Sequence, residues 1–290
     1  MEGDPASGNG ALAADEFVAI INAGISTGVR KVKFLGGEPL ARGDLPAIVA
    51  GVVTPGVDTS IITSGVAAAE RIDALYAAGL SRVNVSIHGW SPTAFATRGG
   101  NPASFAARSR LLDRVLAHGR ACKLNYVYRT KTDEEDLSSL LDWAAGTGVL
   151  VNVLDDLNGD VGAKGVMSTL RRLRGVEARI AIEPDPYSLP TLRLHWNDGL
   201  VVEVKHTRLG QQAPWVACVA CPKRSSCKEG IDAVRLTHTG VLRTCMDRPD
   251  LSLPLVPILR AGGQAAVTEA WATWVASNRA ILRAPHGVAA

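Results

Sequence analysis

The fold of this protein is decided by the stretch Val32-Lys33-Phe34-Leu35-Gly36-Gly37-Glu38-Pro39-Leu40. Its first part, from Arg30 to Leu35, is rich in β-branched and apolar residues and predicts a short strand that stops at two glycines. Adjacent glycines permit backbone conformations closed to other residues and let a ligand approach the main chain. Glu38 then offers a carboxylate, and Pro39 stiffens the turn before the next helix. Barrel and open α/β folds bind ligands at such loops, although an ordinary strand-turn-helix connection has the same pattern.

The rest of the first half alternates in the same way. Further strands are predicted at residues 59–63, 82–87, 122–128 and 150–154. Helices are predicted at residues 12–25, 45–53, 71–78 and 105–117, and another opens at Asp133 with acidic residues in its first turn. Strands that alternate with helices at this spacing indicate a parallel sheet covered by helices.

Composition bounds the class of protein. A chain of 290 residues that is 47% hydrophobic can bury a large core. A net charge of +3 gives no argument for nucleic acid or membrane binding. No apolar run reaches the roughly 18–20 residues of a membrane span, and the segment from Met1 to Pro5 is not a secretory signal. Five cysteines, an odd number, favour a reduced cytoplasm and metal binding over disulfides.

The order of the motifs resembles the radical S-adenosylmethionine (SAM) enzymes, in the branch with the GTP cyclase of molybdenum-cofactor biosynthesis. The segment from Lys33 to Leu45 resembles the family's Gly-Gly-Glu-Pro loop, and three later segments follow in family order: Ile62-Thr63-Ser64-Gly65, Arg82-Val83-Asn84-Val85-Ser86-Ile87-His88-Gly89 and Cys122-Lys123-Leu124-Asn125-Tyr126-Val127-Tyr128. The resemblance implies an α/β fold, a partial (β/α) TIM-type barrel over residues 1–187 that lacks its first strand. Residues 188–290 would form a small cysteine-rich, metal-binding extension like the family's twitch or SPASM regions.

The resemblance also implies a cofactor site. In the family, the loop backbone and its Glu hold the amino group of the methionyl moiety. Carried over, the candidate SAM-binding residues are Gly36, Gly37, Glu38, Pro39, Ser64, Ser86, Lys123 and Asn125. Alternation puts Ser86 on one face with Asn84 and His88, although Ser64 could be an ordinary turn hydroxyl. Arg30, Lys31 and Lys33 are candidates for binding a substrate phosphate or carboxylate, and no residue is assigned a catalytic role.

The family's other hallmark is a Cys-x3-Cys-x2-Cys motif after the first strand, which holds a 4Fe–4S cluster. This sequence has no cysteine before Cys122, and Met1 falls where the residues after that motif would lie. Two explanations stay open: a reading frame that truly starts upstream, or a relative that has lost the cluster. The first is favoured, because a barrel without its first strand exposes an unpaired edge.

Four cysteines gather late in the chain: Cys218, Cys221, Cys227 and Cys245. A hairpin predicted around Thr239-Gly240 would fold the last of them back toward the others. Four thiolates suit a tetrahedral zinc or an iron–sulfur cluster. The residues alone favour zinc, whereas the resemblance favours a 4Fe–4S cluster, and whether three or four thiolates bind stays open. A second hairpin, at residues 191–196 and 200–204 around Asn197-Asp198-Gly199, is expected to begin this C-terminal region after a boundary near residues 185–190.

The implied function is enzymatic. A radical SAM enzyme cleaves SAM to a 5′-deoxyadenosyl radical that abstracts hydrogen from a small-molecule substrate, with a reductant such as ferredoxin or flavodoxin. Because this sequence ends His286-Gly287-Val288-Ala289-Ala290 and not in the Gly-Gly tail of the GTP cyclase, a related activity is expected. Two alternatives remain: a non-catalytic SAM or iron–sulfur binding or scaffold protein, and a zinc-stabilised barrel enzyme of unrelated chemistry.

Overall fold

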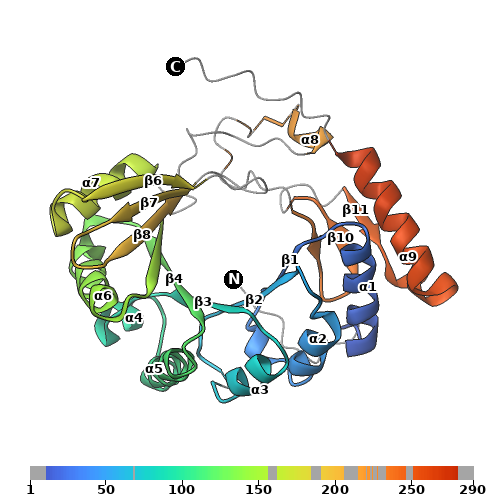
Figure 1. Ribbon diagram of the computed structural model, residues 1–290, viewed down its shortest axis with the longest axis horizontal. Coiled ribbons are helices and arrows are strands. Elements are labelled where there is room, and N and C mark those ends of the chain that lie inside the picture. Colours follow the sequence, from blue (N-terminus) through green and yellow to red (C-terminus); the bar gives the residue numbers. More distant parts are fainter. Residues whose placement is uncertain are drawn as a thin grey trace. The chain divides into compact units, whose positions relative to one another are not determined.

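The computed structural model describes residues 11–67, 69–155, 162–183, 191–205, 215–219, 221–222, 224, 227, 233–245 and 251–279. They fall into two compact units (Figure 1). Unit 1 holds the described residues of 30–183 and 191–205, and unit 2 holds those of 11–29 and 215–279.

Unit 1 is built on an eight-stranded sheet. Its strands, in spatial order, are β1 Lys31–Phe34, β2 Asp58–Thr63, β3 Arg82–Ile87, β4 Ala121–Tyr128, β5 Leu150–Asp155, β8 Val201–Lys205, β7 Thr191–His195 and β6 Arg179–Glu183. The first five are parallel and adjacent in sequence order, β8 runs parallel to β5, and β7 and β6 are antiparallel. Within the described residues β1 and β6 each pair on one side only, so the sheet is open, as expected for a barrel lacking its first strand.

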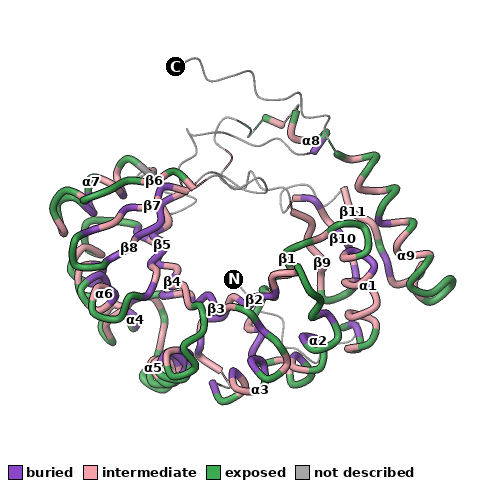
Figure 2. Tube along the Cα trace, in the orientation of Figure 1, coloured by how far each residue is buried: buried purple, intermediate pink, exposed green. Residues whose placement is uncertain are grey.

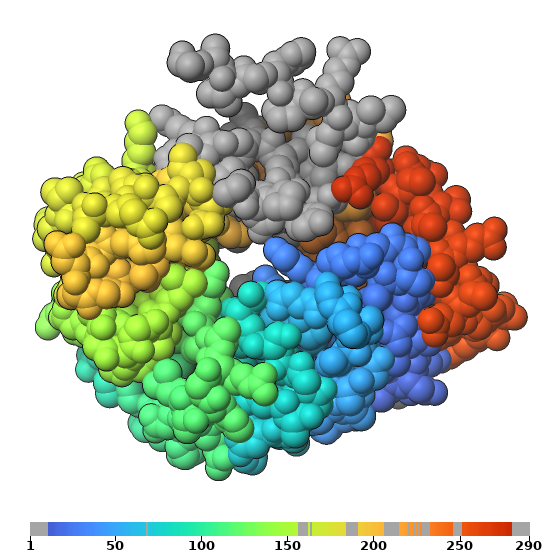
Figure 3. Space-filling model, in the orientation of Figure 1, coloured from blue at the N-terminus to red at the C-terminus, as the bar shows by residue number. Residues whose placement is uncertain are grey.

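Helices cover the outer face of this sheet (Figure 1). They are η1 Pro39–Ala41, α2 Leu45–Val52, α3 Arg71–Ala77, α4 Pro92–Thr97, α5 Pro102–Ala117, η2 Lys131–Asp133, α6 Glu134–Thr147 and α7 Gly162–Arg174. Local sequence sets their ends: Asn101 caps α5 by accepting a 2.9 Å hydrogen bond from the Ser104 amide, and Gly148 ends α6 in the left-handed conformation. In the space-filling view of Figure 3, unit 1 follows an arc in sequence order from blue to yellow.

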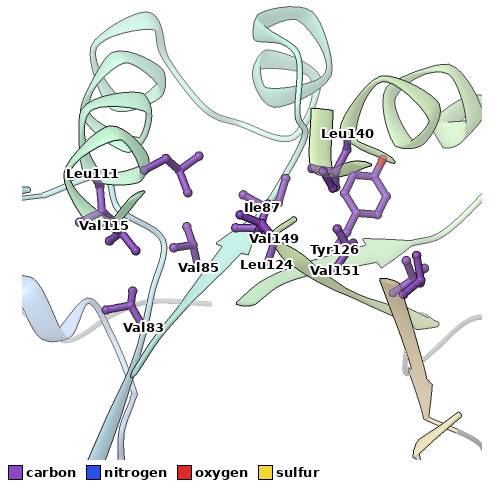
Figure 4. Packing of buried hydrophobic residues seen from close by; sticks show 14 of the residues in the cluster. Val83, Val85, Ile87, Leu111, Val115, Leu124, Tyr126, Leu140, Val149 and Val151 are labelled. Atoms are coloured by element: carbon purple, nitrogen blue, oxygen red, sulfur yellow. The ribbon is translucent and has the colours of Figure 1, made fainter. Parts of the chain in front are cut away.

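The hydrophobic core of unit 1 lies between the sheet and these helices (Figure 2). Alternate strand residues point into it, among them Val83, Val85 and Ile87 of β3, which are at most 1% exposed (Figure 4). The residues between them, such as Asn84 and Ser86, belong to the opposite face, called the inner face below. The inner face is therefore where polar side chains of the parallel strands gather.

The predicted strands and helices of the first half are confirmed, but the structure divides the chain differently from the predicted boundary near residues 185–190. The hairpin of β7 and β8 belongs to the sheet of unit 1 and not to the C-terminal region. The reason is packing: Val202 and Val204 lie opposite Val151 and Val153 in parallel register and extend the same core.

Unit 2 combines the N-terminal helix with the end of the chain. Its elements are α1 Ala14–Ser26, α8 Val216–Val219, β9 Arg235–Leu236, β10 Val241–Arg243, β11 Ser252–Pro254 and α9 Val256–Asn278. The hairpin predicted around Gly240 is present as β9 and β10. Helix α1, predicted as part of the barrel region, packs on α9, where a Cβ on Gly24 would lie 2.8 Å from the Trp271 ring. No helix in the described ranges is long and apolar enough to cross a bilayer.

Candidate functional site

The loop after β1 leaves its main chain open. Gly36 and Gly37 have positive φ angles of 94° and 52°, which side-chain-bearing residues rarely adopt. A Cβ built on either glycine meets nothing within 4 Å. A ligand can therefore approach this backbone at the carboxyl end of a parallel strand.

Glu38 is held entirely by its own chain. Its Oε1 accepts hydrogen bonds from the Thr63 hydroxyl at 2.6 Å and from the Leu40 amide at 3.1 Å. Its Oε2 accepts two from Ser64, one from the amide at 2.9 Å and one from the hydroxyl at 2.5 Å. The carboxylate thus ties the loop after β1 to the end of β2.

The loop is anchored a second time just beyond Glu38. Pro39 is buried, and Leu40 is fully buried in the core of unit 1. The Arg71 guanidinium of α3 donates a hydrogen bond to the Leu40 carbonyl. Pro39, predicted among the cofactor-binding residues, therefore lies on the anchored side of the loop, whereas Gly36 and Gly37 lie on the open side.

The polar residues predicted on the next strands meet in register. Ser86 of β3 lies opposite Asn125 of β4, which lies opposite Asn152 of β5. The Asn152 amide nitrogen donates a 2.9 Å hydrogen bond to the Asn125 side-chain oxygen. These side chains form a polar row on the inner face, and Ser64 follows β2 at the same end of the sheet.

Lys123 has a protein partner that the sequence did not indicate. Its ammonium forms an ion pair with Glu203 of β8, which is 5% exposed, and Glu203 also accepts a 2.7 Å hydrogen bond from Arg193 of β7. Burial acts to raise the pKa of Glu203, but the bonds from Lys123 and Arg193 outweigh it and hold that pKa below its usual range. The hairpin register could have indicated part of this arrangement, because it places Arg193 directly opposite Glu203.

Positive charge collects around Lys33 of β1. Lys33 is exposed to solvent, yet its surroundings lower its pKa, first by partial desolvation and then through the cations Arg82, Lys205, Lys123 and Lys31. Desolvation is the larger cause, and the like charges add to it because they also disfavour the protonated ammonium. Such a cluster attracts an anion.

The loop after β3 is braced by a buried arginine. The Arg108 guanidinium, 1% exposed, donates to the carbonyls of Gly89 at 2.5 Å and Trp90 at 3.1 Å. Asp136 accepts 2.7 Å bonds from the amides of Trp90 and Ser91. Burial lowers the pKa of Arg108 to about 10, although Asp136 opposes this shift. Sequence reasoning missed both residues, because neither stands in a recognisable motif.

The four late cysteines are all described and are free thiols. Burial, and less strongly the neighbouring thiols of Cys245, Cys227 and Cys221, raise the pKa of Cys218 against a hydrogen bond with the Trp215 backbone. These three cysteines therefore lie within electrostatic reach of Cys218. Among the described residues, however, no group of three Cys, His, Asp or Glu side chains is arranged to hold a metal. The predicted cluster or zinc site remains a prediction.

The residues of this sequence do not fit the family's radical-generating cluster. The fifth cysteine, Cys122, lies on β4, and none precedes β1 in the sequence. Burial raises the pKa of Cys122 to about 12, so its thiol stays protonated. No step of cluster chemistry is assigned to residues of this chain.

Comparison with known proteins finds relatives of this chain in one enzyme family. The model of the Radical SAM superfamily matches residues 7–144. The GTP 3′,8-cyclase of Rhodococcus opacus is 31% identical over 260 residues, covering 87% of this chain and 70% of that protein. The probable GTP 3′,8-cyclase of Sulfurisphaera tokodaii is 28% identical over 264 residues, covering 90% and 79%. Among solved structures, Streptococcus suis SuiB bound to S-adenosylmethionine shares 21% identity, with a TM-score of 0.46 over 56% of this chain and 38% of that one. The chain therefore belongs to the radical SAM superfamily of enzymes, whose cofactors are S-adenosylmethionine and a 4Fe–4S cluster.

Proposed function

We propose that this protein binds SAM at the Gly36–Gly37 loop and takes a phosphorylated nucleotide of the GTP class as its substrate. The observation that carries the proposal is the open glycine backbone at the carboxyl end of β1, in the same sheet as the row of polar side chains on the inner face. The relatives' name, GTP 3′,8-cyclase, supplies the substrate class.

The loop and the polar row suit the two ends of SAM. The amino-acid end carries an ammonium and a carboxylate, which main-chain carbonyls and amides can receive where no side chain blocks them. The adenosine end carries hydroxyls and ring nitrogens, which hydroxyl and amide side chains such as Ser86 and Asn125 can bind. Lys123 is not available for this role while Glu203 neutralises it.

The cation cluster around Lys33 suits the substrate. A nucleoside triphosphate brings several negative charges, and Lys33 stands among Arg82, Lys205, Lys123 and Lys31. Arg82 and Lys123 are partly neutralised by Asp58 and Glu203, so less of their charge is available for this attraction. The positive cluster would position the phosphates and leave the nucleoside toward the cofactor.

The cofactors supply the radical chemistry when bound, and the residues of the chain bind and orient the reactants. The proposal includes an electron donor of the ferredoxin or flavodoxin kind. It also includes a 4Fe–4S cluster on Cys218, Cys221, Cys227 and Cys245, with zinc as the alternative occupant.

The proposal is tested by anaerobic titration calorimetry of the full chain with SAM and, separately, with GTP. Both should bind, and the affinity for GTP should fall with added salt because phosphate contacts are screened. A folded chain that binds neither molecule contradicts the proposal. A chain that binds SAM and not GTP retains the cofactor site and removes the substrate class.

A further inference from the structure

The starting point is the saturation of Glu38. A carboxylate offers about four lone-pair sites, and four donors from Leu40, Thr63 and Ser64 fill them. A ligand ammonium could reach Glu38 only as a fifth donor or by displacing one of these bonds. Glu38 is therefore arranged as a brace within the protein.

We propose that Thr63 is a positioning residue for SAM. Thr63 acts through the Glu38 carboxylate, which holds the Gly36–Gly37 main chain in the conformation that binds SAM. Glu38 itself does not contact the ligand. This inference rests on the proposed SAM site, and it replaces the expectation that the Glu38 carboxylate holds the ligand's amino group.

The surrounding structure holds the Thr63 side chain in one position. It is 1% exposed and β-branched, so its side chain has little rotational freedom. Its hydroxyl donates to Glu38 at 2.6 Å, a length typical of a hydroxyl bonded to a carboxylate, and accepts a 2.9 Å bond from the Gly65 amide. Gly65 cannot shift easily, because a Cβ there would lie 2.7 Å from Leu111. The core of unit 1 therefore fixes the position of the Thr63 hydroxyl.

The brace matters because the two glycines are free to adopt many conformations. Leu40 and the Arg71 bond fix the far end of the loop, while nothing within 4 Å would restrain a side chain at Gly36 or Gly37. If only a fraction of the molecules has the loop in the conformation that binds SAM, the apparent affinity for SAM is the intrinsic affinity multiplied by that fraction. Holding Glu38 keeps this fraction high.

The Thr63→Val variant tests the brace through the loop as well as through the ligand. Valine keeps the shape and branching but removes the donor. If Glu38 braces the loop, SAM binding weakens and the loop amides exchange faster. If Glu38 did not brace the loop, the loop amides would exchange as in the wild type.

A matched control lies four residues upstream. Thr59 is on the same strand and face, is also 1% exposed, and its hydroxyl has no partner in the described part of the chain. Thr59→Val therefore repeats the chemical change without touching Glu38. Thr63→Ser restores the donor, and Ser64→Ala removes one donor should Thr63→Val fail to fold.

The experiment is calorimetric titration of SAM into the wild type and these variants, with amide exchange of Gly36, Gly37, Glu38 and Leu40 measured in parallel. We expect about tenfold weaker binding and faster exchange in Thr63→Val, near-wild-type values in Thr63→Ser, and no change in Thr59→Val. Equal SAM affinity in the wild type and Thr63→Val overturns the positioning role and leaves the proposed function standing. If the wild type binds no SAM, the proposed function fails and the ligand role with it. Exchange then decides the brace alone, and unchanged exchange in Thr63→Val overturns it too.

Discussion

The ammonium of Lys123 on β4 and the carboxylate of Glu203 on β8 form an ion pair across the intervening strand β5. Arg193 of β7 binds the same carboxylate and also lies 3.3 Å from Glu183 of β6. The pair therefore joins the parallel part of the sheet to its antiparallel end.

Glu203→Gln is expected to destabilise the protein. The change leaves Lys123 and Arg193 without their shared anion, and breaking a buried pair costs about 3–5 kcal/mol. Because both cations keep some solvent exposure, we expect about 2–3 kcal/mol in urea unfolding. Glu183→Gln, in a more exposed and longer pair, is the matched control and should cost under about 1 kcal/mol. Equal losses in the two variants would contradict this ranking.

The same pair predicts a pH dependence. The folded-state pKa of Glu203 is depressed, so its stabilisation is complete above the unfolded pKa, about 4.3, and is lost as pH falls through the folded value. The difference in unfolding free energy between the wild type and Glu203→Gln should therefore shrink below about pH 4.3. A difference that stays constant from pH 7 to pH 3 would show that the carboxylate charge is not responsible.

Lys33→Ala is expected to weaken GTP binding about fivefold, the effect of losing roughly 1 kcal/mol of charge interaction. Its salt dependence should also become shallower, because one cation of the cluster is gone. Lys164→Ala, at an exposed position on α7, is the control for the loss of one positive charge elsewhere. If both variants weaken GTP binding equally, only net charge matters and the Lys33 cluster is not the site.

Cys218→Ala is expected to remove the metal of the late cysteines. Anaerobically purified wild type should carry iron and sulfide, and loss of one thiolate should reduce both. The matched control is Cys122→Ala. This half-buried thiol on β4 has a pKa raised to about 12 and stays protonated, whereas a metal ligand must be a thiolate, so its loss should leave the metal content unchanged. Stoichiometric zinc without sulfide in the wild type would instead assign a structural zinc site.

Gly36→Ala is expected to cost about 1–2 kcal/mol of stability, because its φ of 94° is unfavourable for any residue with a Cβ. Steric crowding adds nothing, since that Cβ would meet no atom within 4 Å. The control, Gly43→Ala, is equally open but has no positive φ, and should be neutral or stabilising by up to about 1 kcal/mol. Chemical unfolding of both variants checks the contrast.

Sequence reasoning succeeded where the determining signal is local. Alternation from Arg82 to Ile87 and the glycine pair after Phe34 fix a strand and a loop without help from distant residues. It failed where the partner is far along the chain. Nothing within Val201–Lys205 indicates that this strand pairs in parallel with β5, about fifty positions earlier, so the hairpin was assigned to the wrong region.

The same limit applies to the candidate site. Glu38 could be singled out from its motif, but its donors Thr63 and Ser64 lie 25 and 26 residues away, and their hydroxyls look like ordinary turn chemistry in the sequence. Lys123 is predicted as a cofactor ligand from the family resemblance of its strand, and the sequence does not indicate its partner Glu203, 80 residues away. Side-chain pairing of this kind follows from sheet order, which the sequence alone did not supply.

The most direct test of the account is the affinity of SAM for Gly37→Val, measured by calorimetry against the wild type and Gly43→Ala. Valine at Gly37 would strain a φ of 52° and place branched carbon where the ligand must approach. We expect the wild type and Gly43→Ala to bind SAM alike and Gly37→Val to bind at least tenfold more weakly, while circular dichroism shows that it remains folded. Equal affinity in all three, or no binding by the folded wild type, would contradict the Gly36–Gly37 loop as the cofactor site.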